Sequence, residues 1–179
     1  MPNYRRNRVP GGTYFFTVNL LDRRSDLLVR EIDALREAVR RTRGRYPFHV
    51  DAWVVLPDHM HCIWTLPDAD ADFSKRWQTI KTTFSKSLPA VEALSSARAR
   101  RGERGLWQRR FWEYTIRDER DYAAHMDYVH FNPVKHGHAA TAADWPYSSF
   151  RLCVERGLYP RQWLARGVDA APSPFGERK

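Results

Sequence analysis

Residues 48–66 read FHVDAWVVLPDHMHCIWTL, and this stretch decides the fold. Two runs rich in β-branched and aromatic residues, 48–56 and 59–66, flank the dipeptide Pro57-Asp58. Runs of this composition are typical of strands, and strands joined by so short a turn pair as an antiparallel hairpin. The sequence therefore predicts a β-hairpin here.

The second strand of the hairpin begins with two histidines, His59 and His61. Because side chains alternate between the faces of a strand, both point to one side, with Cα atoms about 6.5 Å apart, while Met60 points to the other. Imidazoles at this spacing can share a metal ion, but a bare pair is more often two ordinary polar-face histidines. Asp58 could join such a site, although an aspartate after proline is typical of the turn itself.

The segments around the hairpin predict an α+β protein. Periodicity and composition indicate a strand at 12–21, a helix at 29–43, a second helix at 72–87 and a strand at 107–116. The order is then β-α-β-β-α-β, which is typical of the ferredoxin-like fold with an antiparallel sheet.

A further helix is predicted at residues 119–131. Asp118 stands where an N-cap belongs, and the helix is expected to stop at Asn132-Pro133 because the residue before proline disfavours helical backbone. After it, the chain indicates only short irregular elements and a tail.

Length, composition and charge indicate the domain organisation and the class of partner. The 179 residues predict one main domain at 12–150, a basic N-terminal arm at 1–11 and a partly loose C-terminal extension at 151–179. Residues 89–106 are rich in Ala, Ser, Gly and Arg and predict a flexible basic loop. The net charge of +9 and a pI near 9.9 favour a polyanionic partner such as nucleic acid.

Other classes of protein are disfavoured. No apolar run approaches the roughly 20 residues of a membrane-spanning helix, and the N-terminus lacks the apolar core of a signal peptide. The two cysteines, Cys62 and Cys153, are far apart and in no metal-ligand spacing. We therefore expect a cytoplasmic protein without a disulfide framework. Arg5, Arg6 and Arg8 of the arm are candidates for phosphate contacts, although such a run is as often a solvated tail.

The helix at 119–131 supplies the second half of a candidate site. Tyr122, Met126 and Val129 form its apolar stripe, and Tyr128 and Asn132 stack about a third of a turn away as an i, i+4 pair. A half-exposed surface tyrosine is the simplest interpretation. The alternative is a nucleophile, because a tyrosine hydroxyl becomes competent toward a phosphodiester beside a metal ion, which two histidines and an amide oxygen would hold.

Five motifs in this order resemble the REP-associated tyrosine transposases, single-tyrosine transposases of the HUH single-strand endonuclease superfamily. They cover roughly residues 4–150. In chain order they are GGTYFFTV at 11–18, LPDHMH at 56–61, WQRRFW at 107–112, YVHFNPVKHG at 128–137 and WPYSSF at 145–150.

The resemblance implies an enzyme that cuts and rejoins single-stranded DNA at palindromic repeats folded as hairpins, in bacteria and near the nucleoid. It implies His59 and His61 as ligands of Mg²⁺ or Mn²⁺, Asn132 as the third ligand, and Tyr128 as the nucleophile that becomes linked to a 5′ phosphate. Mobile relatives commonly carry glutamine where Asn132 stands. Monomer and homodimer both remain open. The rival hypotheses are a hairpin-binding protein without cutting activity and a metal-dependent hydrolase, which would leave Tyr128 unused.

Overall fold

The structure, a computed structural model, describes residues 6–90, 96, 100–102 and 104–163. It confirms the α+β class and the predicted hairpin. The strands are β1 (Thr13–Asn19), β2 (His49–Val55), β3 (His59–Thr65) and β4 (Trp112–Thr115). They form one sheet in the order β2-β3-β1-β4, and each neighbouring pair is antiparallel. This order is the ferredoxin-like one, since each helical connection crosses over one intervening strand.

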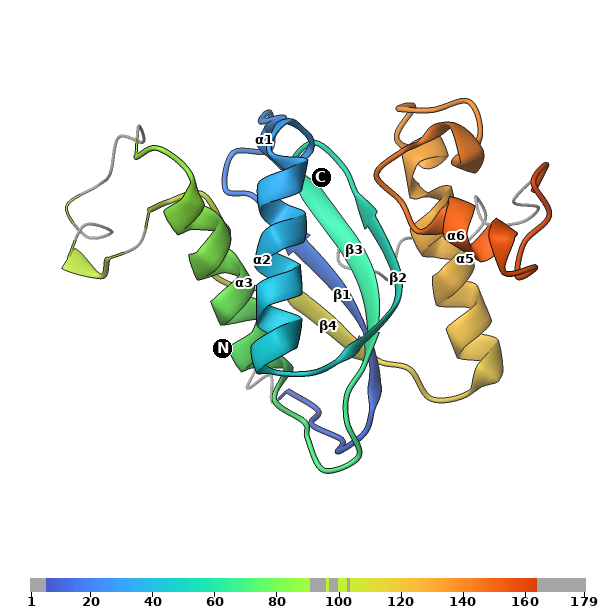
Figure 1. The fold of residues 1–179 in the computed structure, drawn as a ribbon, viewed down its shortest axis with the longest axis horizontal. Helices are drawn as coiled ribbons and strands as arrows, with labels where there is room; N and C mark the ends of the chain where they lie inside the picture. Colours follow the sequence, from blue (N-terminus) through green and yellow to red (C-terminus); the bar gives the residue numbers. More distant parts are fainter. Residues whose placement is uncertain (1–5, 91–95, 97–99, 103, 164–179) are drawn as a thin grey trace, which may run out of the picture.

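The helices cover both faces of the sheet. They are α1 (Leu27–Arg30), α2 (Ile32–Arg45), α3 (Phe73–Ser87), α5 (Glu119–Lys135), the 3₁₀ turn η1 (Ala142–Asp144) and α6 (Phe150–Glu155). Figure 1 shows α2 and α3 side by side across one face, with α5 and α6 grouped on the other side of the sheet. The predicted helix at 29–43 is therefore two helices, broken at Glu31.

Strand alternation divides the core into two clusters. Phe16 and Trp64 face α2 and α3, where the ring of Trp64 stacks on Trp77 with centroids 4.3 Å apart. Phe15 and Ile63, one position away in each strand, face α5 instead. The histidines of β3 have the same parity as Ile63, so the fold places them under α5.

Helix α5 begins as predicted and ends later than predicted. The side chain of Asp118 accepts a hydrogen bond from the backbone N–H of Asp121 at 2.8 Å, which confirms the N-cap. The predicted stop at Asn132-Pro133 is wrong, because the helix continues through Pro133 to Lys135. Proline near the end of a helix removes only one N–H from the ladder, whereas a glycine with positive φ supplies a complete stop signal.

That stop signal is Gly137, with φ at +71°. Its N–H donates to the carbonyl of Val134 at 3.0 Å, and the N–H of His138 donates to the carbonyl of Pro133 at 2.8 Å. These two bonds are the Schellman motif, in which a left-handed glycine ends the helix. The last helical turn of α5 therefore lies beyond Asn132 and carries Lys135.

Two other segments differ from the sequence-based expectation. The strand predicted at 107–116 is regular only over β4, although Trp107 makes an isolated bridge to Leu20. Half of the loop predicted at 89–106 falls outside the described residues, but the guanidinium of Arg104 donates to the carbonyls of Leu88 and Pro89 at 2.8 and 2.6 Å. Within the ranges that the structure describes, no helix has the length and apolar character needed to cross a membrane.

Candidate active site

The candidate site lies where the end of β1, the start of β3 and the last two turns of α5 meet. His59 and His61 lie on the α5 side of the sheet and are 2% and 0% exposed. Their ring centroids are 5.1 Å apart and the rings are nearly perpendicular, at 85°. They are therefore a buried pair in mutual contact, which a surface role on a sheet would not require.

Asp58 holds the ring of His59. Its Oδ1 is 2.7 Å from Nδ1 of His59, and its Oδ2 is 3.0 Å from Nε of Arg23. Burial alone would raise the pKa of this carboxyl, but the hydrogen bond from His59 and the charge of Arg23 bring the pKa below its usual value. An ionised carboxylate can only accept, so Nδ1 of His59 carries the proton.

This tautomer leaves the lone pair on Nε2 of His59. That atom is buried and has no hydrogen-bond partner among the residues that the structure describes. Burial lowers the pKa of His59 and outweighs the opposing effect of Asp58, so the ring is neutral at pH 7. A neutral imidazole with an orphaned lone pair is a poor core residue and a good metal ligand.

His61 is held in a similar way by β1. Its Nδ1 is 2.9 Å from Oγ1 of Thr17, its partner in the β1–β3 register. Its ring stacks on Phe15 with centroids 5.6 Å apart. Each histidine thus has Nδ1 engaged by a neighbouring polar side chain, which fixes the ring before any ligand arrives.

Tyr128 meets the histidine pair from α5. It is only 5% exposed, and its ring centroid lies 5.3 Å from that of His61 at 74° and 5.8 Å from that of Phe15. The interpretation as a half-exposed surface tyrosine is therefore wrong. Asn132, one turn further on the same helix, is fully buried.

The sequence reasoning missed two neighbours at the C-terminal end of α5. Lys135 donates from Nζ to the hydroxyl of Tyr128 at 3.2 Å, and the ring of His136 lies 5.2 Å from that of His59. Gly137 was the signal that could have found them, because a glycine C-cap extends the helix past Pro133. Asp58 was considered, but the turn explained it equally well.

The two histidines supply only part of the ligand set that a divalent cation needs. No group of three His, Cys, Asp or Glu side chains with metal-binding geometry occurs in the described parts of the chain. Two imidazoles would need oxygen ligands, for which the amide of Asn132 and the phosphate oxygens of a substrate qualify. The orphaned Nε2 of His59 is the structural observation that favours such an ion.

The arm arginines lie elsewhere. Arg5 is outside the described residues. Arg6 donates to Oγ of Ser74 at 2.6 Å, lies 3.6 Å from a carboxylate oxygen of the buried Glu113, and stacks over Phe111 at 4.1 Å. Glu113 is on the α2–α3 side of the sheet, so Arg6 is on the face opposite the histidine pair.

Arg8 lies near Arg6, at the start of α3. Its Nη1 is 3.8 Å from Oδ1 of Asp72, and its side chain is half-exposed. The structure therefore brings these two arginines together with α3 and β4 and does not bring them to Tyr128.

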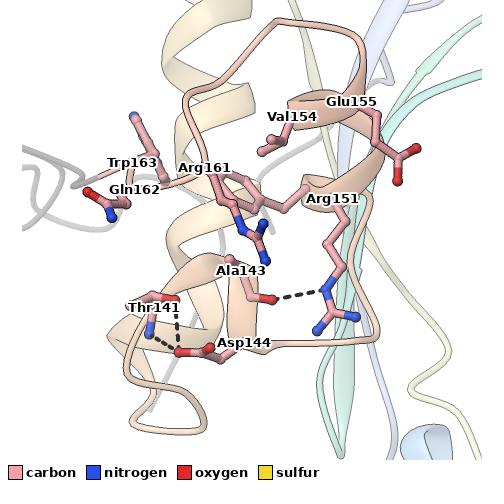
Figure 2. Close-up of a pocket in the computed structure, with 10 residues that line it drawn as sticks. Thr141, Ala143, Asp144, Arg151, Val154, Glu155, Arg161, Gln162 and Trp163 are labelled. Carbon is pink, nitrogen blue, oxygen red and sulfur yellow. Dashed lines mark hydrogen bonds between the residues drawn. The ribbon is translucent and has the colours of Figure 1, made fainter.

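Two further features lie apart from the histidine pair. His125 stacks on Tyr114 with ring centroids 4.8 Å apart, and its Nδ1–H donates to the carbonyl of Asp121 at 2.7 Å. A cleft of about 930 Å³ between η1 and α6, shown in Figure 2, is lined by Arg151 and Arg161 but also by Asp144 and Glu155. It contains none of the predicted site residues, and its formal charges cancel.

A ferredoxin-like sheet with a histidine pair packed against a tyrosine-bearing helix defines a class of protein. The family model described as "Transposase IS200 like" matches residues 13–132, and the chain belongs to this family. Within it, the chain groups with the REP-associated tyrosine transposases, as its motifs predicted. It is 47% identical to the REP-associated tyrosine transposase of Escherichia coli (strain K12) over 178 residues, which cover 99% of this chain and 98% of the relative.

Two other comparisons agree. A putative REP-associated tyrosine transposase of Haemophilus influenzae (strain ATCC 51907 / DSM 11121 / KW20 / Rd) is 44% identical over 164 residues, covering 91% of this chain and 93% of the relative. A solved structure of a REP-associated tyrosine transposase bound to a REP hairpin superimposes with a TM-score of 0.87 at 46% identity, covering 100% of this chain and 99% of the other.

Proposed function

We propose that this transposase nicks and rejoins single-stranded DNA at hairpin-forming palindromic repeats through a covalent bond to Tyr128. The observation that carries the proposal is the contact between Tyr128 and the histidine pair, whose member His59 presents a buried lone pair. Core packing explains a buried tyrosine beside two oriented imidazoles less well than a nucleophile beside metal ligands does.

The step is a transesterification. The hydroxyl oxygen of Tyr128 attacks a backbone phosphorus, and the bond from phosphorus to the 3′ oxygen breaks. The phenol loses its proton and the released 3′ oxygen gains one, so the protons balance. The product is a 5′-phosphotyrosine and a free 3′ end. Because one phosphodiester replaces another, a second 3′ end can reverse the step and be joined without a nucleotide cofactor.

His59, His61 and the amide of Asn132 would hold a divalent cation, with Mg²⁺ or Mn²⁺ suited to sites completed by phosphate oxygens. When bound, the cation would polarise the scissile phosphate and stabilise developing negative charge. Asp58 and Thr17 keep the two imidazoles oriented, and Phe15 packs against both His61 and Tyr128.

The partner is proposed from the relatives. A protein that is 46% identical over the whole chain is bound to a REP hairpin in its solved structure. The charge of +9 suits such a polyanion. Phosphate contacts by the arm, including Arg5, Arg6 and Arg8, are part of this proposal.

The test is incubation of labelled single-stranded hairpin DNA with the protein and Mn²⁺, followed by a denaturing gel. We expect a protein–DNA adduct that survives denaturant. Tyr128→Phe removes the nucleophile but retains the packing against His61 and Phe15, so it should abolish the adduct and leave hairpin affinity unchanged. Cleavage that persists in Tyr128→Phe favours the hydrolase, and binding without cleavage by the wild type favours an inactive hairpin-binding protein.

Tyr128 and His61 are in contact within one chain, which supports a site completed by a single subunit. We therefore propose that a monomer is competent. Mixing His61→Ala with Tyr128→Phe should then restore no cleavage, because neither protein contains a complete site. Restored cleavage in the mixture would instead indicate a dimer that exchanges α5 between subunits.

A further inference from the structure

We propose that Lys135 is a catalytic residue of this site, which orients the Tyr128 hydroxyl and brings a positive charge to the phosphate under attack. The inference rests on the proposed function and deepens it. It assigns the chemistry to a residue pair of α5 in which the lysine contacts the reacting oxygen directly.

The register of α5 places the two residues together. Positions seven apart lie two turns away on the same helix face, and helical side chains lean toward the N-terminus, so Lys135 folds back over the turn that bears Tyr128. This holds only because the helix continues through Pro133 to the Schellman motif at Gly137. A helix ending at Asn132 would leave Lys135 free of this constraint.

The contact combines a hydrogen bond with a cation–π interaction. Nζ of Lys135 is 3.2 Å from the hydroxyl oxygen of Tyr128 and 4.8 Å from the centroid of its ring. Lys135 is exposed, whereas Tyr128 is buried. The ammonium group therefore lies at the solvent boundary of the site, where the hydroxyl and an arriving DNA phosphate both come within its reach.

The charge on Lys135 has a defined use in the reaction. An ammonium group has three donors and no acceptor, so it directs a lone pair of the hydroxyl oxygen and does not remove the proton. As the bond from oxygen to phosphorus forms, negative charge builds on the phosphate oxygens, and a fixed cation beside them stabilises the transition state more than the ground state. The proton balance of the transesterification is unchanged.

Two simpler explanations compete with this role. A lysine in the last turn of a helix stabilises the helix dipole, and a lysine on a basic protein binds DNA backbone. Lys86, which is exposed in the last turn of α3, shares both properties and lies on a different helix from Tyr128. Lys86→Met is therefore a matched control for Lys135→Met.

The experiment measures the single-turnover rate of adduct formation at saturating hairpin DNA with Mn²⁺, and the dissociation constant of the hairpin separately. We expect Lys135→Met to slow the saturated rate by about 100-fold, the loss typical of one donor to a developing anion. Hairpin affinity and the thermal midpoint should match those of Lys86→Met. Lys135→Arg, which retains charge and donors, should recover at least about a tenth of the wild-type rate.

Several results would overturn the proposal. They are a wild-type rate in Lys135→Met, a defect in Lys135→Met that saturating DNA removes, and a rate in Lys135→Arg no better than that of Lys135→Met. An equal loss of rate in Lys86→Met would likewise overturn it, because the overall positive charge of the protein would then explain the loss. If the wild type forms no adduct at all, the proposed function fails and this inference fails with it, a result distinct from all the others.

Discussion

Replacing Asp58 tests whether the histidine pair is built for a metal ion. The Asp58 carboxylate receives the Nδ1–H of His59 at 2.7 Å and is itself held by Arg23 at 3.0 Å. Asp58→Ala removes the acceptor, so the ring is free to rotate and to place its proton on Nε2, where it blocks a ligand bond. Loss of such a partner typically costs 10–100-fold in metal affinity, which is about 1.4–2.7 kcal/mol.

The assay is calorimetric titration with Mn²⁺, together with the Mn²⁺ dependence of adduct formation. We expect Asp58→Ala to need about 10–100-fold more Mn²⁺ and then to reach nearly the wild-type rate. Asp58→Asn should fall between the two, because its amide oxygen still accepts from Nδ1 but lacks the charge.

The control is Asp22→Asn. Asp22 is also paired with an arginine, at 3.6 Å from Nε of Arg24, but its side chain is 63% exposed, whereas the buried His59 holds the carboxylate of Asp58. If Asp58→Ala has the Mn²⁺ affinity of Asp22→Asn, the carboxylate does not orient a ligand and the reasoning is refuted. A rate defect in Asp58→Ala that no Mn²⁺ concentration relieves would refute it equally.

Three further predictions concern stability, measured by urea denaturation. Gly137→Ala places a side chain at a φ of +71° and should cost about 1 kcal/mol, whereas Gly44→Ala, inside α2 with nothing near its added Cβ, should stabilise by roughly 0.5–1 kcal/mol. Burial lowers the pKa of His130 to about 4, below the value of about 6.5 expected in the unfolded chain. The neutral ring should therefore contribute fully to the free energy of unfolding above pH 6.5, and this contribution, about 3 kcal/mol, should be lost as the pH falls toward 4. In His130→Gln, the free energy of unfolding should depend less on pH over this range. Arg6→Gln should cost about 1–3 kcal/mol because it removes a cation that lies 3.6 Å from the buried carboxylate of Glu113.

Much of the architecture follows from local patterns in the sequence. The hairpin at 48–66 has strong strand composition on both sides of a two-residue turn, and its alternation alone puts His59 and His61 on one face. The N-cap at Asp118 was equally readable, because an aspartate accepting from the backbone three residues later is a local interaction. What these signals share is that their partners lie close in sequence.

The environment of the site could not be read in this way. Tyr128 was ambiguous because its burial depends on Phe15 and His61, which come from strands more than sixty residues away. Thr17 gave no signal, since its bond to His61 exists only through the β1–β3 register. The role of Asp58 was hidden by a turn that explained the same residue.

The end of α5 shows how one local rule can conceal a functional contact. The bias against helix before proline acts on Asn132 alone, and the burial of Asn132 and Pro133, both on the packed side of α5, outweighs it. The Schellman bonds at Gly137 then fix where the helix ends. Because those bonds carry Lys135 into the last turn, the ammonium group reaches the Tyr128 hydroxyl two turns earlier. The position of the helix stop, three residues beyond Asn132, therefore decides whether the nucleophile has a cation beside it.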